Sequence, residues 1–456
     1  MKKIIYMIIC TVLLSSCSIY RNYHRPNDLP VDSLYAQNDT VATGDSLTLG
    51  DLSWQEMFRD PLLQDLIVRG LENNTDMQIA LLRVDQAKAQ LRAAKLSFLP
   101  SLTLAPNGTI SSTDGGKAVK AYELPVQASW EVDLFGSLRN AKKGTQATLL
   151  QQKACQQAVC SELIATIAND YYSLLALDEQ ISISQSTLAT WKEQVRTMES
   201  RLKVGEETEN AVTQACAGLY ELEATHNDLL RQRREAENTL CTLLGTTSQN
   251  ISRGTLAAQT LPQEINIGIP VRLLSKRPDV VQAEMELASA YYVTNQARAA
   301  FYPNLTLTGS AGWTNLLGQA VTNPGGWILS AVGSLTQPIF NRGKLLSNLR
   351  VSKDDEQIAK LNYKQALLDA GQEVNDALYA TESVQRTLES HQKQYRELER
   401  TVYTSESLYR TGNATYLELL TARQSLLSAK LNLVSDQYNR LLHVINLYNA
   451  LGGGSE

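Results

Sequence analysis

The sequence predicts a membrane protein of mixed α and β class, built as an internal tandem repeat. Long helices are expected to form an α-helical barrel, and four strands per chain to join those of other copies in a transmembrane β-barrel. Three observations lead to this prediction. A long heptad pattern occurs twice, four segments alternate apolar and polar residues over a membrane-spanning length, and a short apolar N-terminal run ends at a cysteine.

The N-terminus has the features of a secretion signal. Two lysines precede an apolar run from Ile4 to Leu14, which is shorter than the about 20 residues of a membrane helix. The run leads into Leu14-Ser15-Ser16-Cys17, which resembles the lipobox of bacterial lipoproteins. This resemblance implies that Cys17 is the acylated first residue of the mature chain, and that a diacylglycerol group and an N-acyl chain anchor it to a membrane.

Charge and cysteine usage exclude several classes of function. The net charge of −5 over 456 residues leaves no basic surface for nucleic acid. Four further cysteines lie in helical patterns without a CxxC pair, so we expect neither a metal site nor another cofactor. These cysteines are Cys155, Cys160, Cys216 and Cys241.

A heptad seam dominates the first half of the chain. From Cys160 to Leu202 the apolar residues recur at alternating steps of three and four, interrupted by Asp170 and Ser184. The flanking pattern extends the helix over 138–204, a length of about 100 Å at about 1.5 Å per residue. Shorter helical patterns precede it at Trp54 to Asn73 and Asp76 to Leu99, and another follows at 209–244.

Strict alternation marks a strand between these helices. Apolar residues from Tyr122 to Val132 alternate with polar ones, and with the weaker segment Ser101 to Ile110 they predict a hairpin over about 101–133. Each strand has about the length that crosses hydrocarbon, although a soluble sandwich shows the same alternation. The candidates for the polar barrel lumen are Glu123, Glu131 and Asp133.

The same order of elements then recurs. Phe301-Tyr302-Pro303-Asn304-Leu305 repeats Phe98-Leu99-Pro100-Ser101-Leu102 at an offset of 203, and the second seam, Leu367 to Tyr409, lies 207 residues after the first. A glycine-rich turn is expected over 315–326. The expected organisation is a signal peptide at 1–16, an extended anchored segment at 17–53, a first repeat at 54–250, a connector at 251–269, and a second repeat at 270–456 with a hairpin at about 304–339 and helices at about 343–411 and 414–451.

Four strands cannot close a barrel, and an open sheet edge in lipid leaves backbone groups unpaired at several kcal/mol each. The barrel must therefore be shared between copies. Two copies give eight strands around an interior filled by side chains, whereas three give twelve and begin to leave a lumen. The polar strand faces favour the larger barrel, which the long helices would extend away from the membrane.

Several motifs resemble those of the TolC-like outer-membrane factors of tripartite efflux pumps, in particular the lipoprotein branch that serves resistance-nodulation-division transporters. The resemblance covers essentially the whole mature chain. It is carried by Tyr23-His24-Arg25-Pro26, Leu273-Leu274-Ser275-Lys276-Arg277-Pro278-Asp279, Tyr409-Arg410-Thr411-Gly412, Tyr416-Leu417-Glu418-Leu419-Leu420 and Leu447-Tyr448-Asn449-Ala450-Leu451-Gly452-Gly453-Gly454. It implies a homotrimer in outer-membrane lipid that passively conducts small toxic compounds, delivered by an inner-membrane transporter and a periplasmic adaptor.

The family closes its periplasmic end near the helix turns with polar contacts and a ring of acids. Motif matching places one acid position at Glu418, and three copies of this carboxylate around a narrow pore would attract cations. The alternative is a solvent-facing glutamate beside a turn. The second acid position holds Thr421, where many relatives carry Asp. The candidates for the periplasmic tip and gate are Gly205, Glu209, Gly412, Glu418 and Thr421.

Two other classes of function agree less well with the sequence. An enzyme is not expected, because the sequence contains no G-x-S-x-G, HExxH or phosphate-binding G-x-x-x-x-G-K motif and only four scattered histidines. A lipid-anchored periplasmic coiled-coil adaptor or scaffold without a pore would also be helical, but it would lack the four alternating segments.

Overall fold

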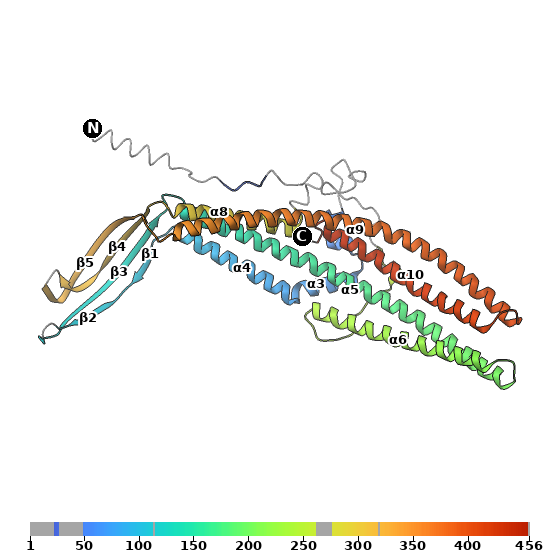
Figure 1. Cartoon of the computed structure of the whole chain (residues 1–456). Coiled ribbons are helices and arrows are strands. Elements are labelled where there is room, and N and C mark those ends of the chain that lie inside the picture. The colour runs from blue at the N-terminus through green and yellow to red at the C-terminus, as the bar shows by residue number, and fades with distance from the viewer. Residues whose placement is uncertain (1–21, 27–48, 113–114, 261–275, 318–319, 455–456) are drawn as a thin grey trace. The chain divides into compact units, whose positions relative to one another are not determined.

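The computed structural model describes residues 22–26, 49–112, 115–260, 276–317 and 320–454 (Figure 1). The chain divides into two compact units, each assembled from separate stretches of sequence. The sheet unit comprises Leu82–Lys153, Gln282–Gln365 and the described N-terminal residues, and the helical unit comprises the other described residues.

Helices of equal length occur in the two halves of the chain. α4 (Thr75–Leu96) and α8 (Pro278–Ala299) have 22 residues each, α5 (Ser137–Lys203) and α9 (Lys344–Arg410) have 67 each, and α6 (Glu209–Leu243) and α10 (Tyr416–Ala450) have 35 each. The shorter elements are η1 (Leu49–Asp51), α2 (Trp54–Met57), α3 (Pro61–Asn73) and η2 (Leu256–Ala258). Both long helices begin and end within one residue of the bounds expected from the heptad pattern.

The helical pattern from Trp54 to Asn73 forms two helices, not the single one expected. α2 ends at Met57, and Asp60 begins α3 by accepting a hydrogen bond from the Leu62 amide at 2.9 Å. Pro61 has no N–H to donate, so it can start a helix but not continue one. The break turns Phe58 into the core, where it is fully buried.

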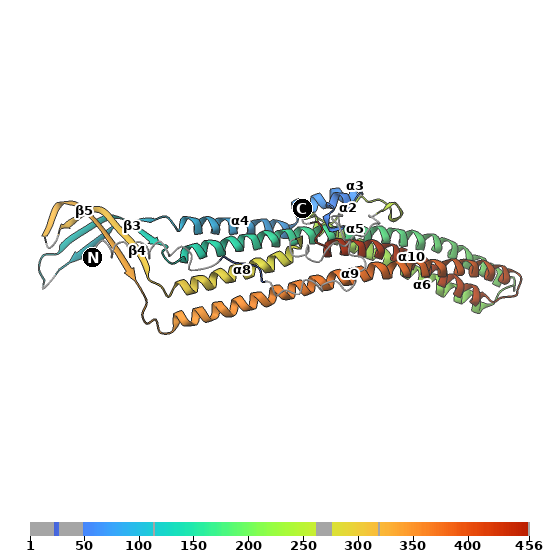
Figure 2. The ribbon, with the colours of Figure 1, turned by 90° about the horizontal axis from the view of Figure 1, so that it is seen from above.

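The sheet is antiparallel, with the order β1-β3-β4-β5 and β2 paired to β3 beyond β1. Its strands are β1 (Ser101–Leu104), β2 (Asn107–Ser111), β3 (Val119–Val132), β4 (Asn304–Leu317) and β5 (Ala320–Thr336) (Figure 1; β3, β4 and β5 are also labelled in Figure 2). β1 and β2 form one broken strand along β3, since Ala105 still donates a backbone hydrogen bond to Pro125. The four expected strands are therefore five segments in four positions.

The turn expected over 315–326 is wrong, because strand residues occupy most of this range. β4 continues to Leu317, and β5 begins at Ala320. Gly325 faces the backbone of Thr314 so closely that a Cβ atom there would clash with the threonine carbonyl oxygen. The glycine therefore allows two strands to approach each other and does not mark a turn.

Equivalent contacts hold the C-terminal ends of α6 and α10. The side-chain amide of Asn74 donates to the carbonyl oxygen of Leu243 at 3.0 Å, and the guanidinium of Arg277 donates to that of Ala450 at 2.8 Å. Both carbonyls belong to the last residue of a helix, where backbone acceptors lack intrahelical partners. One half therefore satisfies this acceptor with a neutral amide and the other with a cation.

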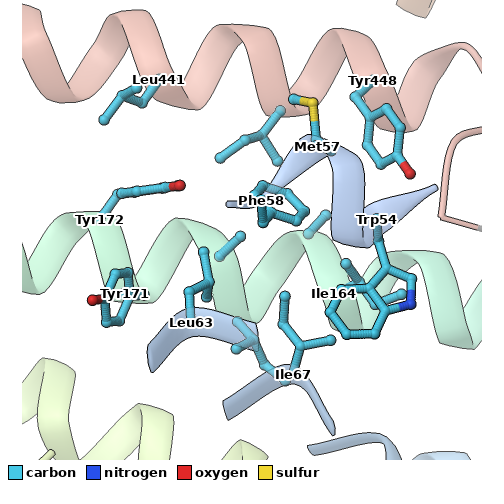
Figure 3. Packing of buried hydrophobic residues seen from close by; sticks show 14 of the residues in the cluster. Trp54, Met57, Phe58, Leu63, Ile67, Ile164, Tyr171, Tyr172, Leu441 and Tyr448 are labelled. Carbon is cyan, nitrogen blue, oxygen red and sulfur yellow. The ribbon is translucent and has the colours of Figure 1, made fainter. Parts of the chain in front are cut away.

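The largest buried cluster lies in the helical unit, where side chains of α2, α3, α5 and α10 meet (Figure 3). The Tyr448 ring packs edge-on against Phe58, with 6.3 Å between centroids. Its hydroxyl donates to the carbonyl oxygen of Leu52 at 2.9 Å. Residues from the two ends of the chain thus share one core.

The two heptad seams are buried to different extents in a single chain. On α5 the seam residues from Leu163 to Met198 are buried apart from Asp170, whereas the distal part of the α9 seam is only half-buried. The half-buried residues are Tyr395, Leu398, Val402 and Tyr409.

Asp170 interrupts the α5 seam and has a destabilising carboxylate. Its Oδ2 atom is buried without a hydrogen-bond partner among the described residues, and this burial raises the pKa of Asp170 to about 6. A folded-state pKa above the unfolded value of about 4 means that protonation favours the folded state. The contribution of protonated Asp170 to the free energy of unfolding is therefore fully present below about pH 4 and is lost as the pH rises through 6.

We expect Asp170→Asn to raise the melting temperature at pH 7.5 by a few degrees relative to the unmodified protein, and to change it little at pH 4. Thermal unfolding followed by circular dichroism in detergent measures both. The exposed Asp376→Asn is the matched control and should leave the pH dependence unchanged. An Asp170→Asn protein that is less stable at pH 7.5 would mean that the charge is paired in the assembled protein.

Candidate functional site

Strand pairing sorts the sheet residues onto two chemically different faces. Residues directly opposite each other on antiparallel strands share a face, and Val126 lies opposite Leu104 and Ala311, whereas Gln127 lies opposite Thr103 and Ser310. The large apolar residues of the first face are exposed in the single chain. They include Leu102, Leu104, Tyr122, Leu124, Val126, Trp130, Leu307, Trp313, Trp327, Leu329 and Leu335.

Glu123 and Glu131 lie on the opposite, polar face. Glu123 pairs with Thr314 of β4 and Asn107 of β2, and Glu131 pairs with Thr306. Both glutamates are exposed. The face continues on β4 with hydroxyl side chains and on β5 with hydroxyl side chains interrupted by Ile328 and Val332, and the Ser310 and Ser330 oxygens are 2.7 Å apart. The sheet therefore has one side suited to hydrocarbon and one suited to water.

Asp133 is placed differently from the prediction that it lines a lumen. β3 ends at Val132, and the Asp133 carboxylate accepts hydrogen bonds from the backbone amides of Leu138 and Arg139 at 3.2 and 3.0 Å. Its side chain is only 7% exposed and also pairs with the Arg139 guanidinium. Asp133 therefore caps the beginning of α5, where backbone N–H groups lack partners and an acid is favoured.

Both edges of the sheet are open within the described chain. β5 has a neighbour only in β4, and the β1 and β2 segments have one only in β3. The Leu329 side chain, on the strand at one edge, is 84% exposed. In hydrocarbon such edges leave backbone groups unsatisfied, so a lipid-embedded form of this sheet requires further strands.

The turn between α5 and α6 and the turn between α9 and α10 have the same geometry. Gly205 and Gly412 adopt φ angles of +78° and +74°, which favour glycine. The amide of Glu206 donates to the Arg201 carbonyl at 3.0 Å, and that of Asn413 to the Leu408 carbonyl at 2.9 Å. These are the bonds of a Schellman motif, which ends each long helix.

The two helix hairpins contact each other near these turns. The Tyr409 hydroxyl bonds the Glu207 carboxylate, and burial together with this carboxylate raises the pKa of Tyr409 to about 12. Beside this contact, within the hairpin of α9 and α10, Glu406 accepts hydrogen bonds from Arg410 at 2.7 Å and from Arg423 at 3.3 Å. Tyr409 and Arg410 belong to one of the sequence motifs, but Glu207 does not. No sequence signal indicates Glu207, because only tertiary packing brings it to Tyr409, about 200 residues away in the chain.

Glu418 has a local role in the single chain. Its carboxylate accepts from the Thr415 amide at 3.0 Å, and its own amide donates to the Thr415 hydroxyl at 3.4 Å. This reciprocal pair is a capping box at the beginning of α10. Thr421 is exposed and donates to the Leu417 carbonyl, and Glu209 is exposed at the first position of α6.

Within the described residues, no helix combines the length and apolar character needed to cross a membrane. The same part of the chain contains no cluster of three acidic, histidine or cysteine side chains that could hold a metal ion. The lipid-attachment candidate Cys17 lies outside the described residues.

Comparison with known proteins identifies the architecture. A family model described as outer membrane efflux protein matches residues 66–246 and 269–453, two segments that begin 203 residues apart and end 207 apart, the offsets at which the Pro100 motif and the heptad seam recur in the sequence. The cation efflux system protein CusC of Escherichia coli (strain K12) is 30% identical over 458 residues, covering 98% of each chain. The probable outer membrane lipoprotein SilC of Salmonella typhimurium is 29% identical over 468 residues, covering 100% of this chain and 99% of SilC.

A solved structure has the same fold over nearly the whole length. The open-state MtrE outer membrane channel of Neisseria gonorrhoeae superimposes with a TM-score of 0.86 at 28% identity, covering 96% of this chain and 99% of MtrE. The mixed fold, with long helices and a two-faced sheet, is thus that of an outer-membrane channel. The chain belongs to the outer membrane efflux protein family, and it is an outer-membrane exit channel of an efflux pump and not an enzyme.

Proposed function

We propose that three copies of this chain form one channel, a twelve-stranded barrel in the outer membrane continued by a helical barrel in the periplasm. The observation that carries the proposal is the two-faced sheet with two open edges. Three copies pair all edges and turn Glu123 and Glu131 toward a water-filled lumen, whereas two copies would bury both glutamates in a filled interior. The half-buried residues of the distal α9 seam become contacts between copies.

The proposed trimer rests on two structural repeats, 54–250 and 270–456, joined by a connector over 251–269. Each repeat contributes two strand positions to the barrel and one pair of long helices to the conduit. As a component of an efflux system, the channel works with a periplasmic adaptor and an inner-membrane transporter. We assign that transporter to the resistance-nodulation-division class, and the cargo to small toxic compounds that the transporter selects.

Oligomeric state and pore activity test the trimer together. Native mass spectrometry of the protein extracted from outer membranes is expected to give three copies, and planar bilayers containing it should show stable conductance steps. A dimer, or a trimer without conductance, would overturn the proposal. A scaffold without a pore would leave the membrane fraction once delipidated, whereas the channel should remain there.

Lipid attachment at Cys17 is the second part of the proposal. SilC is named as an outer membrane lipoprotein, and the segment before Cys17 has the lipobox pattern. We expect Cys17→Ser to lose the whole mass of the diacylglycerol and N-acyl groups from the N-terminal peptide. Intact-mass measurement decides this, and an unchanged mass would exclude Cys17 as the attachment site. Cys155→Ser is the control, since it should leave the acyl mass in place.

A cation-attracting constriction formed by three copies of Glu418 is the third part. Glu418→Ala removes both the charge and the capping box, whereas Thr415→Ala removes the capping box and keeps the charge. We expect Glu418→Ala to lower the cation-to-anion permeability ratio severalfold and Thr415→Ala to leave it unchanged. Reversal potentials across a salt gradient measure this ratio. A ratio that falls equally in both variants, or in neither, would assign Glu418 to capping alone.

A further inference from the structure

The described N-terminal segment, residues 22–26, is bound to the sheet unit by polar contacts. The guanidinium of Arg25 donates two hydrogen bonds to Glu284 of α8, from Nε at 2.8 Å and from Nη2 at 2.5 Å. Three residues earlier, Asn22 accepts a hydrogen bond from the Lys143 ammonium of α5 at 2.5 Å. The segment, here called the strap, therefore contacts one helix from each half of the chain.

Aromatic side chains hold the strap between these two polar contacts. The Tyr23 ring packs edge-on against Tyr291, with 5.9 Å between centroids, and the Tyr23 amide donates to the Tyr292 hydroxyl at 3.3 Å. Burial raises the pKa of the Tyr23 hydroxyl, so this group stays neutral. The strap thus has a fixed position on α8, although its residues form no helix or strand.

Burial is unequal within the ion pair. The Glu284 side chain is 8% exposed, whereas that of Arg25 is 42% exposed. Within the described part of the chain, Arg25 is the only cation in an ion pair with Glu284. A buried carboxylate that loses its bidentate partner is strongly destabilised, whereas the more exposed arginine would be solvated. Glu284 therefore binds the strap because the strap supplies the neutralising charge.

The strap also lies close in sequence to the proposed lipid-attachment residue, Cys17. Asn22 lies five positions after Cys17, a reach of at most about 18 Å at about 3.5 Å per position. Lys143 lies six residues into α5, about 9 Å along the helix from its N-terminus.

We propose that the strap is a positioning clamp, in which the Arg25–Glu284 pair holds the acylated N-terminus beside the end of the sheet that joins α5. The inference rests on the proposed lipid attachment at Cys17. It goes further, because it assigns a role to a specific ion pair and fixes where along the protein the lipid enters the membrane. Each copy of the chain carries its own clamp.

Cross-linking in intact outer membranes tests the clamp. Cysteines replace Asn22 and Lys143, a short bismaleimide joins them, and peptide mass spectrometry quantifies that single link in the full-length protein. We expect Arg25→Met to reduce the yield at least tenfold, because Glu284 is left buried and unpaired. Arg25→Met combined with Glu284→Leu should recover most of the yield, since no charge then remains buried.

Matched controls separate the clamp from other effects. Lys88→Met breaks an exposed ion pair with Asp85 and should leave the yield unchanged. If Arg25→Met prevents folding, the double variant and Glu284→Gln still report on the strap. An unchanged yield in Arg25→Met would overturn the proposal. The mass of the N-terminal peptide in the same samples reports acylation separately, so loss of the lipid and loss of the clamp give different results.

Discussion

Val126→Arg is expected to reduce the amount of channel integrated into the outer membrane to less than a tenth of normal. Val126 lies in the middle of β3 on the apolar face and is 46% exposed in the single chain. An arginine on the lipid-facing side of a barrel destabilises the membrane-inserted state by about 2–4 kcal/mol near the membrane midplane. The proposed trimer would contain three such arginines. Carbonate-resistant membrane protein, quantified by immunoblot, measures the effect.

The neighbouring Gln127→Arg provides the matched control. Gln127 belongs to the same strand but lies opposite Thr103 and Ser310 on the polar face. We expect this variant to integrate at nearly the normal level, because its guanidinium would enter water and not hydrocarbon. Equal integration of both variants would contradict the assignment of the apolar face to lipid.

Tyr448→Ala is expected to lower the free energy of unfolding of the helical unit by about 3–5 kcal/mol, the cost of removing a large buried ring. Tyr448 is 2% exposed, packs against Phe58 and bonds the Leu52 carbonyl. Tyr448→Phe keeps the ring and removes only the hydroxyl, so it should cost about 0.5–1.5 kcal/mol through loss of one hydrogen bond to the part-buried Leu52 carbonyl. Urea unfolding followed by circular dichroism gives both values.

An exposed tyrosine tests whether this cost comes from burial. Tyr403 is 80% exposed on α9, so Tyr403→Ala should change the free energy of unfolding by less than about 0.5 kcal/mol. If Tyr403→Ala and Tyr448→Ala were equally destabilising, helix propensity and not core packing would explain the loss.

The long helices were predictable because their signals are local. Gly205 and Gly412 end the long helical patterns, and each adopts the positive φ angle that a helix-ending turn requires. Alternation in β3 likewise predicts that Glu123 and Glu131 share one face of the strand, and the strand pairing places polar residues opposite both. Such patterns can be recognised in the sequence because the hydrophobic period and the turn residues both involve residues that are close along the chain.

Errors arose where contacts outside a residue's own helix or strand decide its role. Asp133 continues the alternation of β3, but the beginning of α5 takes its carboxylate once the strand has ended. Gly325 is a turn residue by composition, and only its closeness to Thr314 shows that it belongs to a strand. The Tyr409–Glu207 contact joins two hairpins, so neither residue's neighbours in sequence could indicate it.

The paired contacts of Asn74 and Arg277 bear on the ancestry of the gene. Duplication and fusion of a shorter reading frame would leave two segments with helices of matching length and the same helix-end acceptor filled at the same place. The two segments now fill this position with different groups, an amide in one and a guanidinium in the other. The chemistry of this position therefore differs between the two segments although its geometry is the same. A ligand that contacts both segments would encounter the same shape with a different charge.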